Sequence, residues 1–284
     1  MTLESGAHEV TGSLLAADSF RVRGAVRGAE AGAAADAAAD AAADAPAGAA
    51  VRGFTRHLER FSQAASAAWV DVSPEAKTAY IAGRISAFLD AARTRLARSG
   101  DGFPRFELWE ADPSDSIREP RLALAIRKLP QLQLTIALRS CPSGPLPRAR
   151  RKGPNIARYA ALRHELGAEP LLLDREGRVL EGATTSLIWW NRETHRGAVS
   201  ALPDRVPSVT EALIRDAAEL EPRVATLGEL LHHEVWAVNA LHGIRPVSHI
   251  DGARCAPHDQ ERLAHFREML DRRWEPITDP RARR

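Results

Sequence analysis

The residues best suited to chemistry fall in five short polar segments that follow one another along the chain. They are His57-Leu58-Glu59-Arg60, Lys152-Gly153-Pro154-Asn155, Glu181 to Ser186, Ser208-Val209-Thr210 and Asn239-Ala240-Leu241. A serine or threonine that opens a helix, together with an arginine, suits phosphate binding, because backbone N–H groups and positive charge meet there. A lysine buried beside other cations can lose its proton and act as a nucleophile. Each segment alone would equally fit an ordinary solvated helix or loop.

Signatures of several large enzyme classes are missing from the sequence. There is no GxSxG, no GxxxxGK[ST], no GxGxxG after a predicted strand and no HExxH. His232 and His233 are adjacent, so their side chains would project to different sides of a regular element, and we expect no metal site there. The absence of these motifs disfavours elbow-type serine hydrolases, P-loop enzymes, dinucleotide-binding enzymes and HExxH zinc proteases.

Hydrophobic periodicity predicts an α+β fold for the N-terminal half. A strand with a turn precedes an amphipathic helix that carries Phe54, Leu58 and Phe61 on one side. The further predicted elements are a helix over 74–96 and strands over 103–109, 122–129 and 133–138. Residues 29–50 are nearly all alanine, aspartate and glycine, and we interpret them as an exposed insertion, since alanine offers little to bury. A repeat protein is the alternative, but the AAAD unit recurs only three times.

The segment 141–154 marks a change along the chain, because four prolines, two glycines and a basic run are typical of a connection. The elements predicted beyond it are a helix over 155–166, a hairpin that turns at Gly177, a strand over 183–190, a helix capped by Ser208, a strand–loop–strand unit over 234–252 and a helical tail over 260–274. The sequence therefore predicts an N-terminal domain over 1–140 and a C-terminal domain over 155–284.

Charge, cysteine spacing and apolar runs argue against a nucleic-acid partner, disulfides and a membrane span. Lys and Arg total 39 against 37 Asp and Glu, which leaves a formal charge of +2 and no footprint for nucleic acid. Cys141 and Cys255 lie too far apart for a CxxC pair and do not form a disulfide framework. No signal-peptide pattern and no run of apolar residues long enough to span a membrane occurs, so we expect a cytoplasmic protein.

In this order, and joined by LLLD-x-x-G-x-V-x-EG, the five segments resemble the fold-type IV pyridoxal-phosphate enzymes, which include class IV aminotransferases and aminodeoxychorismate lyase. The resemblance runs from Asp18 to about Gly252 outside the insertion, and is strongest in PLLLDREGRVLEGATTSLIWW. It implies a two-domain class IV aminotransferase-like fold with a barrel-like C-terminal sheet. It also implies pyridoxal 5'-phosphate between the domains, a small amino substrate and a homodimer.

The resemblance assigns roles to individual residues. Lys152 would carry the cofactor as a Schiff base, and Arg150 and Arg151 could lower its pKa if they face inward. Glu181 would pair with the pyridine nitrogen. The phosphate would be held by Arg60, by Val209 and Thr210 at a helix start, and by the turn at Asn239 and Ala240.

Substrate contacts are assigned to three residues: Phe20 and Val22 on the first strand, for which core packing is the alternative, and Arg105, which could meet a carboxylate. Two positions depart from the family pattern, since Ser186 replaces an asparagine and Ile156 stands near a tyrosine of some aminotransferases. The run NAL, followed by I-x-P-V, favours aminodeoxychorismate lyase. The alternatives are an aminotransferase for branched-chain or D-amino acids and a catalytically silent cofactor-binding relative.

Overall fold

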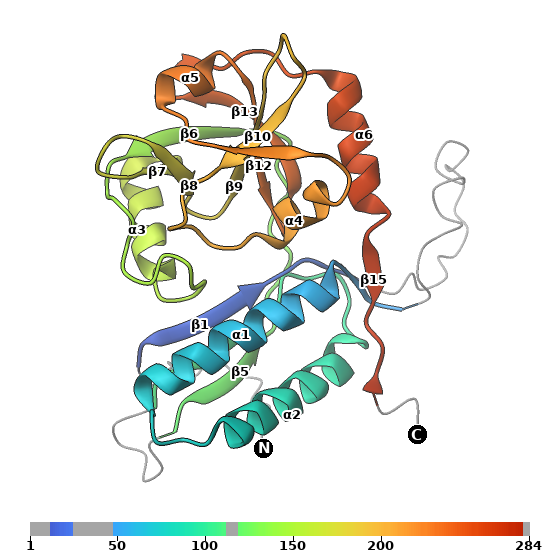
Figure 1. Cartoon of the computed structure of the whole chain (residues 1–284). Coiled ribbons are helices and arrows are strands. Elements are labelled where there is room, and N and C mark those ends of the chain that lie inside the picture. The colour runs from blue at the N-terminus through green and yellow to red at the C-terminus, as the bar shows by residue number, and fades with distance from the viewer. Residues whose placement is uncertain (1–11, 25–47, 112–118, 281–284) are drawn as a thin grey trace, which may run out of the picture.

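Phenylalanine side chains form the core of the N-terminal unit in the computed structural model, which describes residues 12–24, 48–111 and 119–280. The rings of Phe61, Phe88 and Phe106 pack with centroids 5.3–6.0 Å apart. Around them, two helices cover a three-stranded antiparallel sheet (Figure 1), formed by α1 (Phe54–Val72), α2 (Thr78–Leu96), β1 (Leu14–Ser19), β4 (Arg105–Trp109) and β5 (Arg121–Ala125). The expected helices are confirmed, although α2 begins at Thr78 and not at Pro74.

The C-terminal unit is a curled nine-stranded mixed sheet (Figure 1). Its strands are β6 (Ile136–Cys141), β7 (Glu169–Leu173), β8 (Val179–Gly182), β9 (Ser186–Trp190), β10 (Gly197–Ser200), β11 (Leu220–Arg223), β12 (Glu234–Asn239), β13 (Gly243–Ile250) and β14 (Ala253–Arg254). Its helices are α3 (Ile156–Leu166), α4 (Val209–Arg215), α5 (Leu227–Leu231) and α6 (Gln260–Asp271). Successive side chains of a strand point to opposite faces, so Trp189 and Trp190 belong to separate hydrophobic clusters. The predicted α+β class is confirmed, whereas β10, β11 and α5 were not anticipated.

Two strands cross the domain ranges expected from the sequence. β6 pairs in parallel with β13 and β7, so it belongs to the larger sheet, although most of it falls within 1–140. β15 (Trp274–Pro276) follows α6 and pairs with β3 (Ala50–Arg52) beside the N-terminal unit (Figure 1). β3 also pairs with β2 (Val22–Arg23). Hydrophobic pattern reveals a strand but not its partner, which is why the sequence placed most of β6 in the N-terminal domain and the end of the chain in the C-terminal domain.

The end of the alanine-rich segment corrects the expected insertion. Ala49 and Ala50 are fully buried, and Ala50 is the first residue of β3. Their small side chains fit against the N-terminal core, so burial here depends on close packing and not on a large apolar group. The rest of the expected insertion, up to residue 47, lies outside the described residues.

The connection between the units docks directly on β1. The backbone N–H of Ala17 donates a hydrogen bond to the carbonyl oxygen of Lys152 at 2.7 Å. The next residue, Gly153, has φ +129°, and a Cβ there would lie 2.7 Å from the nitrogen of Ala17. Only glycine combines this backbone conformation with so close an approach. The docking sets the position from which the Lys152 side chain projects.

Gly153→Ala should therefore lower the free energy of unfolding by about 1–3 kcal/mol, because the new Cβ would overlap β1. Gly83→Ala is the matched control, since Gly83 lies exposed in α2 with open space around it. That change should raise stability by about 0.5–1 kcal/mol. Urea unfolding of both variants measures the difference, and equal effects of the two substitutions would contradict the docking.

Candidate active site

A cavity of about 1440 Å³ is lined by residues of both units. Eight of the ten site residues predicted from the sequence line it: Arg60, Arg105, Lys152, Glu181, Val209, Thr210, Asn239 and Ala240. They come from α1, β4, the connection over 141–154, β8, α4, the end of β12 and the loop that follows it. The fold thus brings segments that lie far apart in the sequence to one cavity, as the order of the five segments along the chain suggested.

Phe20 and Val22 do not line the cavity, and their predicted contact with substrate is corrected. Both side chains are fully buried in the N-terminal core. The ring of Phe20 packs on those of Phe54 and Phe106, with centroids 5.6 and 4.9 Å apart. The polar neighbour Ser19 faces the cavity instead. Side-chain alternation beyond the end of β1 therefore turns Phe20 inward.

Lys152 is the one lysine of the chain whose environment suits a nucleophile. The sequence holds two others, Lys77 and Lys128, and both are exposed. Burial, and then the positive charge of Arg60, lower the pKa of Lys152 from 10.5 to about 8. Arg127 acts in the same direction, whereas Arg151 forms an ion pair with Asp71 at 2.8 Å. The cations beside the amine thus come from other elements, and not from the preceding arginines.

Glu181 is a buried carboxyl group with few partners. Burial raises its pKa from 4.5 to about 8, and the backbone N–H of Val206 donates to its Oε1 at 3.1 Å. The following residue must be small, because a Cβ at Gly182 would lie 2.2 Å from the hydroxyl of Thr185. A buried carboxyl group in this state needs either a proton or a cation against it.

Arg60 is held rigidly by a carboxylate that the sequence did not reveal as part of the site. Asp18 is fully buried and accepts hydrogen bonds from Nε and Nη2 of Arg60, each at 2.7 Å. Its Oδ1 also lies 2.7 Å from Nδ1 of the buried His57. Burial alone would raise the pKa of Asp18, but Arg60 and His57 hold it well below its ordinary value.

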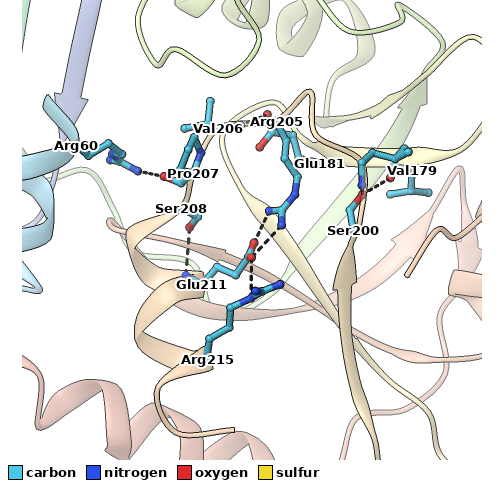
Figure 2. Close-up of polar contacts among 11 residues, drawn as sticks. Arg60, Val179, Glu181, Ser200, Arg205, Val206, Pro207, Ser208, Glu211 and Arg215 are labelled. Atoms are coloured by element: carbon cyan, nitrogen blue, oxygen red, sulfur yellow. Dashed lines mark hydrogen bonds and ion pairs between the residues drawn. The ribbon is translucent and has the colours of Figure 1, made fainter. Parts of the chain in front are cut away.

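The segment 205–208 joins Arg60 to Glu181 (Figure 2). The carbonyl oxygen of Pro207 accepts from Nη1 of Arg60 at 2.8 Å, one residue after Val206 donates to Glu181. Arg205 anchors the segment through two contacts with Glu211, at 2.5 and 3.0 Å. Ser208 then caps α4 as predicted, accepting the N–H of Glu211 at 3.2 Å. Through this segment the arginine and the carboxyl group are positioned together.

The β12–β13 loop is fixed by one of its own side chains. Oδ1 of Asn239 accepts the N–H groups of Leu241 and His242, and its Nδ2 donates to the carbonyl oxygen of Thr184. Ala240 packs against the N-terminal core. The amide of Asn239 therefore holds the loop in place beside the cavity, while the first turn of α4 brings Val209 and Thr210 to the same cavity.

Sequence reasoning also missed other polar residues of the cavity, among them Tyr159 and Arg127. Burial, and then Glu181, raise the pKa of Tyr159 to about 12, so an aromatic hydroxyl lies near Glu181, one helical turn beyond Ile156. Arg127 donates to the hydroxyl of Ser19 and the carbonyl oxygen of Phe103, each at 3.0 Å. By contrast, Arg105 is paired with Glu107. No motif marked Tyr159 or Arg127, because each lies outside the five segments.

Neither a metal site nor a membrane helix is found in the described parts of the chain. Within residues 12–24, 48–111 and 119–280, no three His, Cys, Asp or Glu side chains are grouped so that they could hold an ion. Over the same ranges, none of the helices has the length and apolarity needed to cross a membrane.

Asp18→Asn should lower the free energy of unfolding at pH 7 by about 3–5 kcal/mol, because it removes one partner of a buried ion pair. Since the folded pKa of Asp18 is depressed, its stabilisation is present above the ordinary value of 3.8 and is lost as pH falls below it. The difference from wild type should persist from pH 7 to pH 5 and should shrink only in stronger acid.

Urea unfolding across this pH range makes the measurement, with Asp71→Asn as the matched control. Asp71 is largely exposed in its pair with Arg151, so its loss should change stability by less than about 1 kcal/mol. A difference for Asp18→Asn that already disappears between pH 7 and pH 5 would contradict the assignment.

Known structures share this fold at low sequence identity. The branched-chain aminotransferase of Thermoproteus uzoniensis, solved with norvaline, is 16% identical, with a TM-score of 0.68 over 93% of this chain and 90% of that one. The branched-chain amino acid aminotransferase of Thermobaculum terrenum in its PLP form is 15% identical, with a TM-score of 0.65 over 93% and 89%. A hypothetical aminotransferase from Mycobacterium tuberculosis in its PLP-bound form is 18% identical, with a TM-score of 0.64 over 93% and 89%.

No curated protein matches the sequence. The family described as amino-transferase class IV matches residues 45–250, a range that holds every residue of the cavity, from His57 to Ser248, except Ser19. Because this match covers more than half of the 284 residues, the chain belongs to the amino-transferase class IV family and has the two-domain fold of that family.

Proposed function

We propose that the protein is a pyridoxal-phosphate-dependent enzyme whose reaction takes place at Lys152. The observation that carries this proposal is that an amine and a carboxyl group with opposite pKa shifts, Lys152 and Glu181, face one cavity. The residues fit the cofactor, because the buried, underpaired Glu181 suits a protonated pyridine nitrogen. Arg60 and the start of α4 suit its phosphate. When bound, pyridoxal phosphate withdraws electrons from the carbon that bears the substrate amine.

The protein side chains would bind, orient and move protons. Lys152 in its neutral form removes a proton from the carbon that bears the amine and later returns a proton. Arg127 influences Lys152 electrostatically and, within the described residues, has hydrogen bonds only to uncharged oxygens, so it suits a substrate carboxylate near the reacting carbon. Arg60 stays fixed by Asp18 and does not need to reorganise when a phosphate arrives.

The reaction we favour is the release of pyruvate from aminodeoxychorismate. Lys152 would take the ring proton at the amine-bearing carbon, the C–O bond to the enolpyruvyl group would break, and a returned proton would convert the departing enol to pyruvate. Arg127 and Arg245 line the cavity and form no ion pair within the described residues, which suits a substrate with more than one carboxylate. The NAL loop and the following I-x-P-V support the same choice.

The second candidate is an aminotransferase reaction, which the family membership and the branched-chain aminotransferases of similar fold support. Purified enzyme incubated with aminodeoxychorismate alone, and separately with pairs of amino acids and oxo acids, distinguishes the two. Release of pyruvate and 4-aminobenzoate without an amino acceptor supports the lyase. Transfer of an amino group to an added oxo acid, with no pyruvate released, would replace it with the aminotransferase.

Assembly and location are part of the proposal. Leu132 and Leu134 line the cavity, and Leu134 is 76% exposed, so a second copy of the chain could cover this apolar edge. We propose a cytoplasmic homodimer, which sedimentation of the purified protein would test. A protein that sediments as a monomer at micromolar concentration would contradict the dimer.

Lys152→Ala should abolish the visible absorbance that wild-type protein acquires with pyridoxal phosphate, because no other lysine lines the cavity. Lys128→Ala is the control, as Lys128 is exposed, and it should keep the full absorbance. Absorption spectra after dialysis make the measurement. A wild-type protein that stays colourless, or a coloured Lys152→Ala variant, would contradict the proposal.

The reactivity of Lys152 should follow its lowered pKa. In cofactor-free protein, the rate at which fluorodinitrobenzene labels Lys152 should rise with pH and level off just above pH 8, because only the neutral amine reacts. Arg60→Gln should shift this profile to higher pH by removing a neighbouring positive charge. Mass spectrometry of the labelled peptide reads the rate, and a rate that still climbs beyond pH 10 would show an ordinary lysine.

A further inference from the structure

Arg245 is a buried cation at a part of the cavity that the proposed proton transfers do not involve. It lies on β13, its side chain lines the cavity, and it is only 4% exposed. Ile244 and Val247 on the same strand belong to different hydrophobic clusters, one on each face of the sheet. Strand alternation places Arg245 on the face of Val247, inside the curl of the sheet.

The guanidinium of Arg245 has almost no protein partner. Its Nη1 lies 3.4 Å from Oε1 of Gln133, and its buried Nε has no hydrogen-bond partner among the described residues. Burial lowers its pKa to about 10, while the charge of Glu169 opposes the shift and that of Arg163 adds to it. A buried guanidinium in this state would be stabilised by an anion.

The carboxylate whose charge acts on Arg245, that of Glu169, is already occupied. Oε1 of Glu169 accepts the N–H of Thr184 at 2.6 Å and its hydroxyl at 2.7 Å. Oε2 of Glu169 accepts from Nη2 of Arg163 at 2.6 Å. Glu169 therefore neutralises Arg163 directly, and the described part of the chain shows no ion pair for Arg245.

His242 supplies a neutral donor beside Arg245. Burial, and then Arg245 itself, lower the pKa of His242 to about 4, so the ring is uncharged at neutral pH. Its Nδ1 lies 3.3 Å from the backbone nitrogen of Gln133 and accepts that N–H, which places the ring proton on Nε2. A neutral imidazole N–H next to an unpaired guanidinium suits a carboxylate oxygen.

This group is separate from the residues around the reacting amine. The charges that act most strongly on Lys152 are those of Arg60, Asp18, Glu181 and Arg127. The cations that act on His242 are Arg245, Arg163 and Arg21. The cavity thus holds two positive regions, one at Lys152 and one at Arg245.

We propose that Arg245, with His242 and Gln133, binds a carboxylate of the substrate that is remote from the carbon bearing the amine. The inference rests on the proposed function and specifies it, because it assigns the enzyme to substrates that carry at least two carboxylates. Arg245 is then a specificity-determining residue, while Arg105, which the sequence pointed to, is neutralised by Glu107.

Calorimetric titration of pyridoxal-phosphate-loaded protein tests the proposal with carbon-matched acids. Succinate, glutarate and adipate are compared with butyrate, valerate and hexanoate. Wild-type protein should bind at least one dicarboxylate roughly tenfold or more tightly than its monocarboxylate partner, since the second carboxylate gains a charged hydrogen bond. Arg245→Gln should reduce that preference to less than twofold, and Arg245→Lys should retain part of it.

Arg267→Gln is the matched control, because Arg267 also lies next to β13, donating to the carbonyl oxygen of Ile244, but does not line the cavity. It should keep the preference. Equal binding of both acids by wild type, or a preference that survives Arg245→Gln, would overturn the proposal. Should Arg245→Gln not fold, wild type and Arg245→Lys decide the outcome. Failure to bind pyridoxal phosphate contradicts only the proposed function. The same titrations of cofactor-free protein then decide this inference, because calorimetry needs no turnover.

Discussion

The buried carboxylate of Asp18 is the constraint on which the rest of the site depends. A charge that is removed from solvent must be paired. The carboxylate of Asp18 is paired with Arg60 and His57, which both lie on α1. The pair fixes α1 against β1, the strand on which the Lys152 connection docks. One ion pair therefore sets the relation between the arginine proposed to bind phosphate and the lysine proposed to react.

Burial also shifts the pKa values of the two groups proposed to react, Lys152 and Glu181. Lys152 and Glu181 lose most of their contact with solvent, so the amine favours its neutral form and the carboxyl group keeps its proton more readily. The segment 205–208 couples them structurally, because neighbouring residues contact Glu181 and Arg60 (Figure 2). A bound cofactor with a phosphate at one end and a basic nitrogen at the other would satisfy both ends of this arrangement.

Much of this site could be predicted from the sequence, because its residues sit in short runs whose order is informative. Lys152, Glu181 and Arg60 were found in this way, and the Ser208 cap was predicted from local chemistry alone. Residues that depend on tertiary packing were missed or misplaced. Asp18 and Arg245 carry no local signal, since a lone charged residue on a strand looks the same whether it faces solvent or a cavity.

Sheet partners were equally beyond local reasoning. β6 reads as a strand from its pattern, but nothing in its six residues shows that it pairs with β13, more than 100 positions later. Phe20 was expected in the site because the family's first strand reaches it, yet the neighbouring Ser19 is the residue that faces the cavity. Because successive side chains of a strand point to opposite faces, an error of one residue is enough to confuse a core residue with a site residue.

The central claim is that Lys152, Glu181 and Arg60 contact three parts of one cofactor. A crystal structure of the protein soaked with pyridoxal phosphate tests it most directly. The account predicts density that is continuous with Nζ of Lys152, a phosphate against Arg60 and the first turn of α4, and the ring nitrogen at Glu181. Density bound elsewhere in the cavity, with Lys152 unmodified and its phosphate away from Arg60, would contradict it.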